Sequence, residues 1–387
     1  MKICIVSPYP PVKDGIGIFS EKIVRLLRKQ NNEVLVLSTP FGEVKQDSVF
    51  RWVSFSVSNI LKSIRLIRKE KADIIHVQYA IATYGIYSFP LLCFLLYLRF
   101  SGFKNIVATY HEVKRDNDLL GFVGIMYYRL FSKLFSSIFI HTREAEKILI
   151  NACGVSSSKI HVIPHGLYEF QDTHDYQQEL KEKYHIANIQ VILYFGFIHV
   201  DKGIQHLIRA IAHLKEANPA LVSNMKVLIV GSVRERKGLF RIFELKDKQY
   251  FDRLLKLVNE NKLSSEIQFI GHIEEKYIYS LFKLSKIVVL PYEKVEQSGV
   301  LHVALAAGKP IVASSIGGLG EVLQNSGVLV APGNYKEIAS AINHLMTDEK
   351  YYQNITKDYS TLSSKIGNEH MTDELISAYQ SILNYEK

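Results

Sequence analysis

The chain has 387 residues, of which 48% are hydrophobic, and a formal net charge of +9. That length is too great for one ordinary core, so it favours two or three domains, and the composition excludes a disordered chain. Residues 1–167 hold 22 Lys and Arg against 12 Asp and Glu, a net charge of +10, whereas residues 168–387 hold 25 against 26, a net charge of −1. The asymmetry predicts an anionic partner for the first half, with solvated helix surfaces as the alternative.

The first residues form an apolar segment, 1–6, that runs directly into a proline-rich turn at 7–11. This region lacks a long apolar stretch and a small-residue cleavage site, so we expect no signal peptide. The three cysteines, Cys4, Cys93 and Cys153, show neither a pairing pattern nor a C-x-x-C spacing. Unpaired cysteines favour a reducing compartment, and we therefore expect a cytoplasmic protein.

The first half alternates predicted strands with predicted helices. Strands are expected at residues 2–6, 33–38, 73–77, 105–109, 137–141 and 160–163. Most of these segments are unbroken apolar runs, which is typical of strands covered on both faces in a mainly parallel sheet. After the first strand, Gly15 and Gly17 stand in an expected loop before a helix at about 21–29, where glycines allow a ligand to approach the backbone. Their spacing falls short of the G-x-G-x-x-G dinucleotide fingerprint.

Three segments of the first half, 60–71, 88–100 and 121–135, combine apolar and basic residues. The first is an amphipathic basic helix whose apolar face holds Ile60, Leu61, Ile64 and Ile67. The second is shorter than the roughly 20 residues that a membrane span needs. Such helices either lie in the headgroup plane of a membrane or pack their apolar faces against a sheet. Together with the charge of +10, they predict peripheral contact with an anionic membrane surface.

The second half repeats the alternation with a core of its own. Strands are expected at residues 190–195, 225–230, 267–270, 286–290, 311–313 and 327–330. The polar stretch 168–185 lacks a buried-strand pattern and is interpreted as the connection between two domains. Two α/β domains in series predict a ligand in the cleft between the carboxyl ends of their sheets. After Asn334 the pattern is helical, and the last segment, about 371–385, is expected to return to the first domain.

Residues 291–310 carry the clearest binding pattern. The strand at 286–290 leads into Gln297-Ser298-Gly299, a small-residue helix follows over 300–307, and Gly308 and Pro310 end it. At the start of this helix, unpaired backbone N–H groups and the positive end of the helix dipole meet beside a residue that has no side chain. The pattern predicts an anion site, most simply for a phosphate, with a plain turn as the alternative.

Motifs in both halves resemble, in order and spacing, the retaining glycosyltransferases of family 4. Its nucleotide-sugar half is matched by residues 194–203, 230–231, 269–273, 291–310 and 316–321, and its acceptor half by residues 15–17, 109–112, 141–142 and 162–166. The resemblance implies a GT-B fold of two Rossmann-like α/β/α domains with a central cleft. It places the acceptor-binding domain at 1–170, with about 371–387 packing back on it, and the nucleotide-sugar domain at 171–370. It also implies transfer with retained anomeric configuration, without a metal or another cofactor.

The resemblance assigns roles to individual residues. Lys202 matches a lysine on the donor diphosphate, where a cation stabilises the charge that the leaving group gains. His111 matches a histidine beside the donor sugar, and Glu296 is taken as the first of two family glutamates, also near that sugar. These three are the expected catalytic residues. Besides Lys202, the expected donor-binding residues are Gly15, Gly17, Gly196, Gly231, Gly271, His272, Ile273, Ser298, Gly299, Val300 and Leu301.

Two positions depart from the family pattern. Phe197 stands in place of an arginine that helps to neutralise the diphosphate. Arg234, Arg236 or Lys237 would supply that charge instead, or would simply belong to an exposed loop. The second glutamate, expected on the ribose, falls on Val303, which puts donor affinity in doubt.

The leading hypothesis is a retaining hexosyltransferase that moves a sugar from a UDP- or GDP-sugar to a lipid-linked or polysaccharide acceptor. It would act at the cytoplasmic face of the membrane, in lipopolysaccharide or exopolysaccharide synthesis. One alternative is a catalytically weak or inactive partner subunit that still binds nucleotide sugar. Another is a nucleotide-sugar epimerase, which shares the fold but leaves the basic first half unexplained. No nucleic-acid partner is expected.

Overall fold

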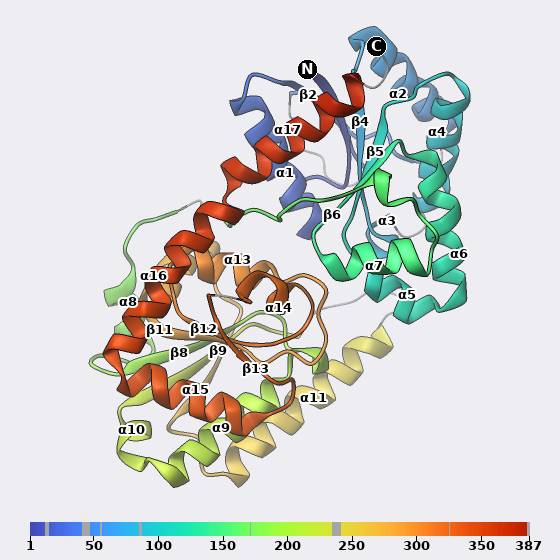
Figure 1. The fold of residues 1–387 in the computed structure, drawn as a ribbon. Coiled ribbons are helices and arrows are strands. Elements are labelled where there is room, and N and C mark those ends of the chain that lie inside the picture. The colour runs from blue at the N-terminus through green and yellow to red at the C-terminus, as the bar shows by residue number, and fades with distance from the viewer. Residues whose placement is uncertain are drawn as a thin grey trace. The chain divides into compact units, whose positions relative to one another are not determined.

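A computed structural model of the chain describes residues 1–11, 15–40, 47–54, 56–84, 87–170, 172–233, 241–324 and 326–384. The chain forms two compact units, the first comprising Met1–Gly166 and Ile366–Lys387 and the second Leu167–Lys365. The sequence placed these boundaries at 170 and 371, four and five residues away. Each unit is a parallel sheet flanked by helices (Figure 1), which confirms the predicted fold of two Rossmann-like α/β/α domains.

The described part of the first unit contains seven strands in the order β3-β2-β1-β4-β5-β6-β7, all paired in parallel. Their bounds are β1 Lys2–Val6, β2 Glu33–Leu37, β3 Val49–Phe50, β4 Ile74–Tyr79, β5 Ile106–Tyr110, β6 Ser137–Ile140 and β7 Ile160–Val162. The six predicted strands are confirmed to within two residues at each end. Strand β3 was not predicted, because two residues are too short to show a pattern.

The described helices of the first unit are α1 Gly15–Lys29, α2 Val57–Glu70, α3 Ile81–Tyr84, α4 Ser88–Phe100, α5 Val113–Leu120, α6 Phe122–Phe131, α7 Arg143–Asn151 and α17 Asn368–Asn384. Helix α1 begins six residues earlier than predicted, so Gly15 and Gly17 lie in its first turn and not in a loop. Glycine disfavours a helix by about 1 kcal/mol per residue, and the sequence pattern therefore delayed the predicted start. The buried Phe19 and Ile23 anchor this end of α1 in the core.

Both faces of the first sheet are covered. On one face α1 and α17 pack against strand residues that include Ile5 and Val36. On the other, α2, α4, α6 and α7 pack against the alternate residues, among them Val6 and Leu37. Helix α17, at the C-terminus, thus lies against α1 (Figure 1), which confirms the predicted return of the chain to the first unit.

The described part of the second unit contains six parallel strands in the order β10-β9-β8-β11-β12-β13. The strands are β8 Gln190–Phe195, β9 Met225–Val230, β10 Ile267–Gly271, β11 Ser285–Leu290, β12 Ile311–Ser314 and β13 Val328–Val330. All six were predicted to within one residue. The described helices are α8 Gln177–Lys183, α9 Ile204–Ala217, α10 Pro219–Ser223, α11 Arg241–Glu260, α12 Ile278–Leu284, α13 Gly299–Ala306, α14 Gly317–Leu323, α15 Tyr335–Thr347 and α16 Glu349–Ile366.

The interpretation of 168–185 as a plain connection is wrong for its second part. Helix α8 buries Leu180, and the Tyr277 hydroxyl donates a hydrogen bond of 2.5 Å to Glu179 Oε1. A further bond of 2.8 Å joins Tyr176 N to Ser280 Oγ. Because α8 is seven residues long and only one described side chain in it is buried, its sequence looks polar throughout.

Candidate functional site

Three glycines lie at the carboxyl ends of neighbouring strands in the second unit. Gly196, Gly231 and Gly271 have φ angles of 135°, 146° and 77°. Gly231 tolerates no side chain, because a Cβ there would stand 1.8 Å from the carbonyl oxygen of Gly196. Gly231 N donates to Gly271 O at 2.8 Å, which joins the two strand ends. The carboxyl ends of parallel strands are where open α/β sheets bind ligands, and here they present backbone without side chains.

Helix α13 begins close to these glycines. A Cβ built on Gly196 would stand 3.6 Å from Val300 Cγ2, and one on Gly299 would meet no atom within 4 Å. Ser298 is the N-cap residue, and its Oγ accepts a hydrogen bond of 3.3 Å from Leu301 N. The first turn contains no acidic residue. The amide groups and the dipole at this end suit an anion, and phosphate binding here stays a prediction.

Lys202 lies beside the start of α13. Its ammonium is 3.7 Å from the centre of the Tyr292 ring, and the Tyr292 hydroxyl is 3.5 Å from Ser298 Oγ. Gly203 makes this approach possible, since it has a φ of 61° and a Cβ there would stand 1.9 Å from Pro291 O. Asp201 O also accepts a hydrogen bond of 2.9 Å from Glu293 N. The structure therefore brings Gly196 and Lys202 together with residues 298–301, which follow them by about 100 positions in the sequence.

Glu296 lies in the loop between β11 and α13. Its carbonyl oxygen accepts a hydrogen bond of 2.9 Å from Gly318 N. Gly317 and Gly318 pack so tightly that their Cβ atoms would stand 2.1 Å from Val295 O and 2.7 Å from Glu296 O. The backbone at Glu296 is thus held by close packing against Gly317 and Gly318, and a catalytic role for its carboxylate stays a prediction.

The departures from the family pattern change the surface of this site. Val303 is buried in α13, so an apolar side chain occupies the place of the ribose glutamate. Phe197 is 53% exposed and puts an aromatic ring where an arginine is expected. Arg234, Arg236 and Lys237, considered above as substitutes, lie outside the described residues. Beyond Gly271, His272 is exposed and Ile273 is buried, which leaves the backbone and His272 accessible to a base.

In the first unit, His111 follows β5 directly. Its backbone N–H donates to Tyr79 O at 3.0 Å, so the β4–β5 pairing continues by one residue. Its side-chain Nε2 lies 2.8 Å from Gln78 Oε1, and its ring meets the edge of Phe19 at a centroid distance of 5.2 Å. Burial, with the neighbouring histidines, lowers the pKa of His111 well below 6.5, so the imidazole is neutral at neutral pH.

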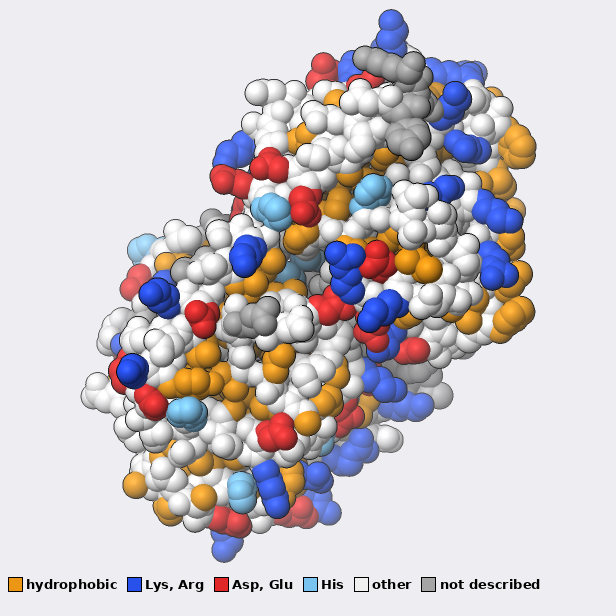
Figure 2. All heavy atoms as spheres, in the orientation of Figure 1, with side chains coloured by type: hydrophobic (Ala, Val, Ile, Leu, Met, Phe, Trp, Pro, Cys, Tyr) orange, Lys and Arg blue, Asp and Glu red, His pale blue; other side chains and the backbone are white. Residues whose placement is uncertain are grey.

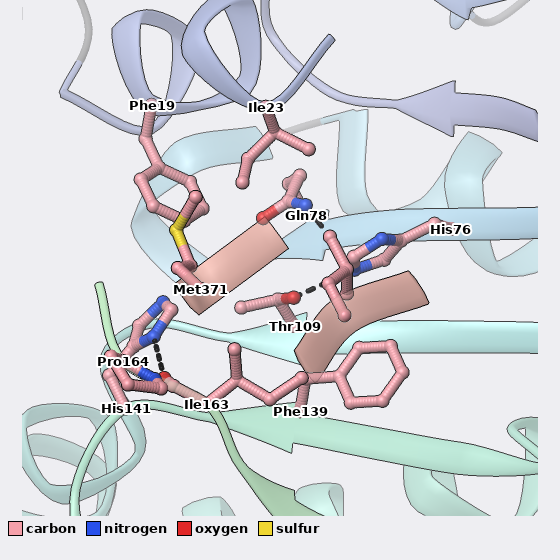
Figure 3. Close-up of a pocket in the computed structure, with 11 residues that line it drawn as sticks. Phe19, Ile23, His76, Gln78, Thr109, Phe139, His141, Ile163, Pro164 and Met371 are labelled. Atoms are coloured by element: carbon pink, nitrogen blue, oxygen red, sulfur yellow. Dashed lines mark hydrogen bonds between the residues drawn. The ribbon is translucent and has the colours of Figure 1, made fainter. Parts of the chain in front are cut away.

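The sequence analysis did not identify the buried polar residues near His111. His76 and His141 line a small cavity with Gln78 and Thr109 (Figure 3). Burial lowers the pKa of His76 to about 3 and that of His141 to about 4, so both are neutral. One pattern in the sequence could have indicated them. His76 and Gln78 stand at alternate positions of an otherwise apolar strand, and buried polar side chains on one face need hydrogen-bond partners.

Gly15 and Gly17 occupy different environments at the start of α1. A Cβ on Gly17 would stand 3.3 Å from Pro8 O, which shows that this glycine lets α1 approach the segment after β1. Gly15 is exposed, and a Cβ there would meet nothing within 4 Å. Gly15 thus leaves open space where a side chain would stand, while Gly17 has a packing role.

The described residues contain no cluster of three or more His, Cys, Asp or Glu side chains arranged to hold a metal ion. Within the same residues, no helix has both the length and the apolar character that a membrane crossing demands.

Two family models match the chain. "Glycosyl transferases group 1" matches residues 176–359, inside the second unit, and "Glycosyltransferase Family 4" matches residues 13–168, almost all in the first. Together the matches include both groups of residues described above and every described strand except β1.

Individual proteins agree with these matches. N-acetyl-alpha-D-glucosaminyl L-malate synthase of Bacillus anthracis is 23% identical over 418 residues, covering 99% of this chain and 97% of that protein. Lipopolysaccharide 1,2-N-acetylglucosaminetransferase of Salmonella typhimurium is 26% identical over 215 residues, covering 54% of this chain and 53% of that protein. The structure of Anabaena HepE in complex with UDP-glucose has a TM-score of 0.73 at 17% identity, covering 98% of this chain and 100% of that one. Its likeness shows the GT-B fold. The chain is a glycosyltransferase and belongs to the group 1 / family 4 glycosyltransferases, as its motifs predicted.

Proposed function

We propose that this chain is a retaining glycosyltransferase that takes a sugar from a UDP- or GDP-sugar bound by the second unit. The observation that carries this proposal is the meeting of Lys202, Gly196 and the N-terminus of α13 within that unit. The UDP-glucose in the Anabaena structure supports a nucleotide sugar as the donor class. Retention is supported by the match to motifs of a retaining family.

The chemistry asked of Lys202 is electrostatic. Breaking the bond between sugar and nucleotide leaves additional negative charge on the diphosphate. The Lys202 ammonium and the backbone amides at the start of α13 stabilise that charge as it develops, which favours the transition state over the bound donor. A charge-assisted contact of this kind contributes roughly 1.5–3 kcal/mol. Because these groups supply positive charge, we further propose that transfer needs no metal.

For the sugar itself we propose contacts from His111 and Glu296. His111 is neutral and largely buried, with one ring nitrogen bonded to Gln78, so the ring is fixed before any substrate binds. Glu296 sits on a loop held by Gly317 and Gly318. Both would act on the sugar while it is being transferred, with a phosphate oxygen of the departing diphosphate as the proton acceptor.

For the acceptor we propose a lipid-linked or polysaccharide glycan at the cytoplasmic face of an anionic membrane. The Salmonella relative is named for its action on lipopolysaccharide, which supports this class. Most of the apolar face predicted for α2 does not contribute, because Ile64 and Ile67 are buried in the core and only Leu61, at 38%, is exposed. Other apolar side chains take its place, and Phe100 of α4 and Phe122 of α6 are 88% and 74% exposed.

We define the apolar–basic surface as the apolar residues of α4, α5 and α6 that are more than half exposed, with the exposed basic residues of α2 and α6: Phe89, Phe100, Leu119, Phe122, Val123, Leu130, Lys62, Arg65, Arg68, Lys69 and Arg129. Figure 2 shows hydrophobic side chains beside Lys and Arg along the edge formed by α4 and α6. Each basic residue near an anionic leaflet contributes on the order of 1 kcal/mol, and inserted apolar side chains add to that.

Liposome flotation tests the membrane part of the proposal. Binding is expected to anionic liposomes and not to neutral ones, and to fall with salt. A Phe100→Ser and Phe122→Ser double variant should lose binding, whereas Leu245→Ser, a control at an exposed apolar residue of the second unit, should keep it. Equal absence of the wild-type chain from both kinds of liposome would mean a soluble acceptor.

A second candidate function is a catalytically weak partner subunit that binds nucleotide sugar. Two observations favour it, the burial of Val303 where a ribose glutamate is expected and the exposed Phe197 in place of an arginine. Both reduce the polar contacts available to the donor.

A thermal-shift panel of UDP-, GDP- and ADP-sugars tests the donor proposal. A ligand that binds only the folded state raises stability by RT ln(1 + [L]/Kd), so the preferred nucleotide gives the largest shift. A shift with one uridine or guanosine donor, reduced in Lys202→Met, is the expected result. The absence of a shift with every donor would contradict the proposal.

A further inference from the structure

A chain of buried polar side chains runs from the C-terminal helix to His111 in the first unit. Tyr379 Oη lies 2.5 Å from His76 Nδ1, and the other His76 nitrogen, Nε2, lies 2.7 Å from Thr109 Oγ1 and 3.3 Å from Gln78 Nε2. Gln78 Oε1 then lies 2.8 Å from His111 Nε2. Figure 3 shows the middle of this chain, where Gln78 and Thr109 both point toward His76. His76, Gln78 and Tyr379 are almost completely buried.

Packing alone does not call for these residues. The same face of β4 carries Ile74 in the core between the sheet and α1, and an apolar side chain at position 76 or 78 would bury without needing partners. Instead, these buried polar groups form a continuous series of hydrogen bonds, and each group restricts the orientation of the next.

The Gln78 amide determines which groups in this series of hydrogen bonds donate and which accept. An amide nitrogen only donates hydrogen bonds and an amide oxygen only accepts them. His76 Nε2 faces the amide nitrogen and therefore accepts, so the neutral His76 ring carries its proton on Nδ1 and donates it to the Tyr379 hydroxyl. His111 Nε2 faces the amide oxygen and therefore donates. The neutral His111 ring then keeps its lone pair on Nδ1, to which the described residues make no hydrogen bond.

We propose that Gln78 is a positioning residue that holds His111 in the neutral Nε2–H form, so that Nδ1 accepts a hydrogen bond from a hydroxyl group of the sugar substrate. The proposal rests on the proposed function, in which His111 contacts the donor sugar. A neutral imidazole with a fixed proton recognises a hydroxyl as a donor, and a wrong tautomer would present N–H against that hydroxyl.

The groups around His111 agree with a neutral ring. His141, after β6, lies at a ring-centroid distance of 5.1 Å, and Phe19 of α1 presents its edge at 5.2 Å. Lys22, also on α1, lies 5.2 Å from the centre of Phe19 and donates to His165 O at 2.9 Å. The adjacent carboxylate, Glu112, pairs with Arg115 at 2.5 Å. A positive His111 would therefore lie near other cations and histidines without a carboxylate of its own among the described contacts.

Side-chain histidine NMR of the full-length wild-type chain tests the proposal without any turnover measurement. Long-range ¹⁵N–¹H correlation at pH 7 is recorded, and a His111→Asn variant identifies the His111 signals. The expected result is a protonated Nε2 and an unprotonated Nδ1. A proton on Nδ1, or on both nitrogens, would overturn the proposal, and neither result depends on whether the donor assignment is correct.

Two substitutions of Gln78 extend the test. Gln78→Glu keeps the side-chain size but adds a charge that attracts a proton, so His111 should become doubly protonated near neutral pH and kcat should fall about 10- to 100-fold. Gln78→Met removes the acceptor and should give mixed tautomers with a similar loss of kcat. Nucleoside diphosphate Kd should stay within about twofold in both. An unchanged His111 tautomer in folded Gln78→Met would overturn the role of Gln78, and if neither variant folds, the wild-type spectrum decides.

Discussion

At the residue scale, Lys202 is the side chain on which we propose that donor binding depends most. Its ammonium lies over the Tyr292 ring beside the first turn of α13, so its removal leaves the backbone amides as the main contacts for a diphosphate. Lys202→Met should weaken nucleoside diphosphate binding about 10- to 100-fold, as the loss of a charge-assisted contact implies.

Calorimetry measures this effect, with Lys215→Met as the control. Lys215 belongs to α9 of the same unit and pairs with Glu266 at 2.6 Å. Its removal should leave nucleotide affinity unchanged. If the two variants lost affinity equally, Lys202 would have no special place in the site.

His111 has a different expected signature. If it acts on the sugar during transfer, His111→Ala should lower kcat at least 10-fold and leave nucleoside diphosphate Kd nearly unchanged, since its contacts are made mainly in the transition state. His370→Ala is a suitable control, because His370 is exposed on α17 of the same unit and pairs only with Glu374 in the described contacts. Parallel losses of kcat and of nucleotide affinity in His111→Ala would contradict the assigned role.

At the scale of elements, the N-terminus of α13 combines a structural cap with the proposed diphosphate site. Ser298→Ala removes the bond to Leu301 N, which should reduce the free energy of unfolding by about 1 kcal/mol and also weaken nucleoside diphosphate binding.

The N-cap of α15 provides a matched comparison. Asn334 Oδ1 accepts a hydrogen bond of 3.3 Å from Glu337 N, so Asn334→Ala should lose similar stability and keep its nucleotide affinity. Urea unfolding and calorimetry on both variants separate the two effects. Equal losses of affinity would mean that destabilisation, and not the α13 site, accounts for the change in Ser298→Ala.

The elements also show how far the sequence alone predicts the molecule. Parallel strands buried on both faces give unbroken apolar runs, so twelve of the thirteen described strands were predictable and the two-residue β3 was not. The strand, loop and helix that end at α13 were predictable because they are contiguous in the sequence. That Lys202 lies near this helix was expected only from the family resemblance, since a packed pair such as Lys202 and Tyr292, about 90 residues apart, leaves no local pattern. The bond between His76 and Tyr379 joins residues 303 positions apart and was missed altogether.

At the scale of the whole molecule, buried neutral histidines predict how stability changes with pH. Burial lowers the pKa of His76 to about 3, that of His141 to about 4 and that of His111 well below 6.5. Above pH 6.5 these groups are neutral in both the folded and the unfolded chain. Below it, the unfolded chain binds protons that the folded one excludes, so each histidine lowers the free energy of unfolding by up to about 1.4 kcal/mol per pH unit down to its folded pKa.

Urea unfolding followed by tryptophan fluorescence checks this prediction in the first unit specifically. The only tryptophan, Trp52, packs against the core of that unit. The urea midpoint should fall steadily between pH 6.5 and pH 4.5 and stay level between pH 7 and pH 8. A midpoint that does not change below pH 6.5 would mean that these histidines are not held neutral.

The anomeric configuration of the first product shows whether the transfer is retaining. The donor is the α-linked UDP- or GDP-sugar that gives the largest thermal shift, water serves as the acceptor, and ¹H NMR records the released sugar before its anomers interconvert. We expect the α anomer to appear first, at a rate that Lys202→Met and His111→Ala both reduce. Release of the β anomer first would contradict a retaining transfer, and no release from a donor that clearly binds would show a nucleotide-sugar-binding subunit in place of an active transferase.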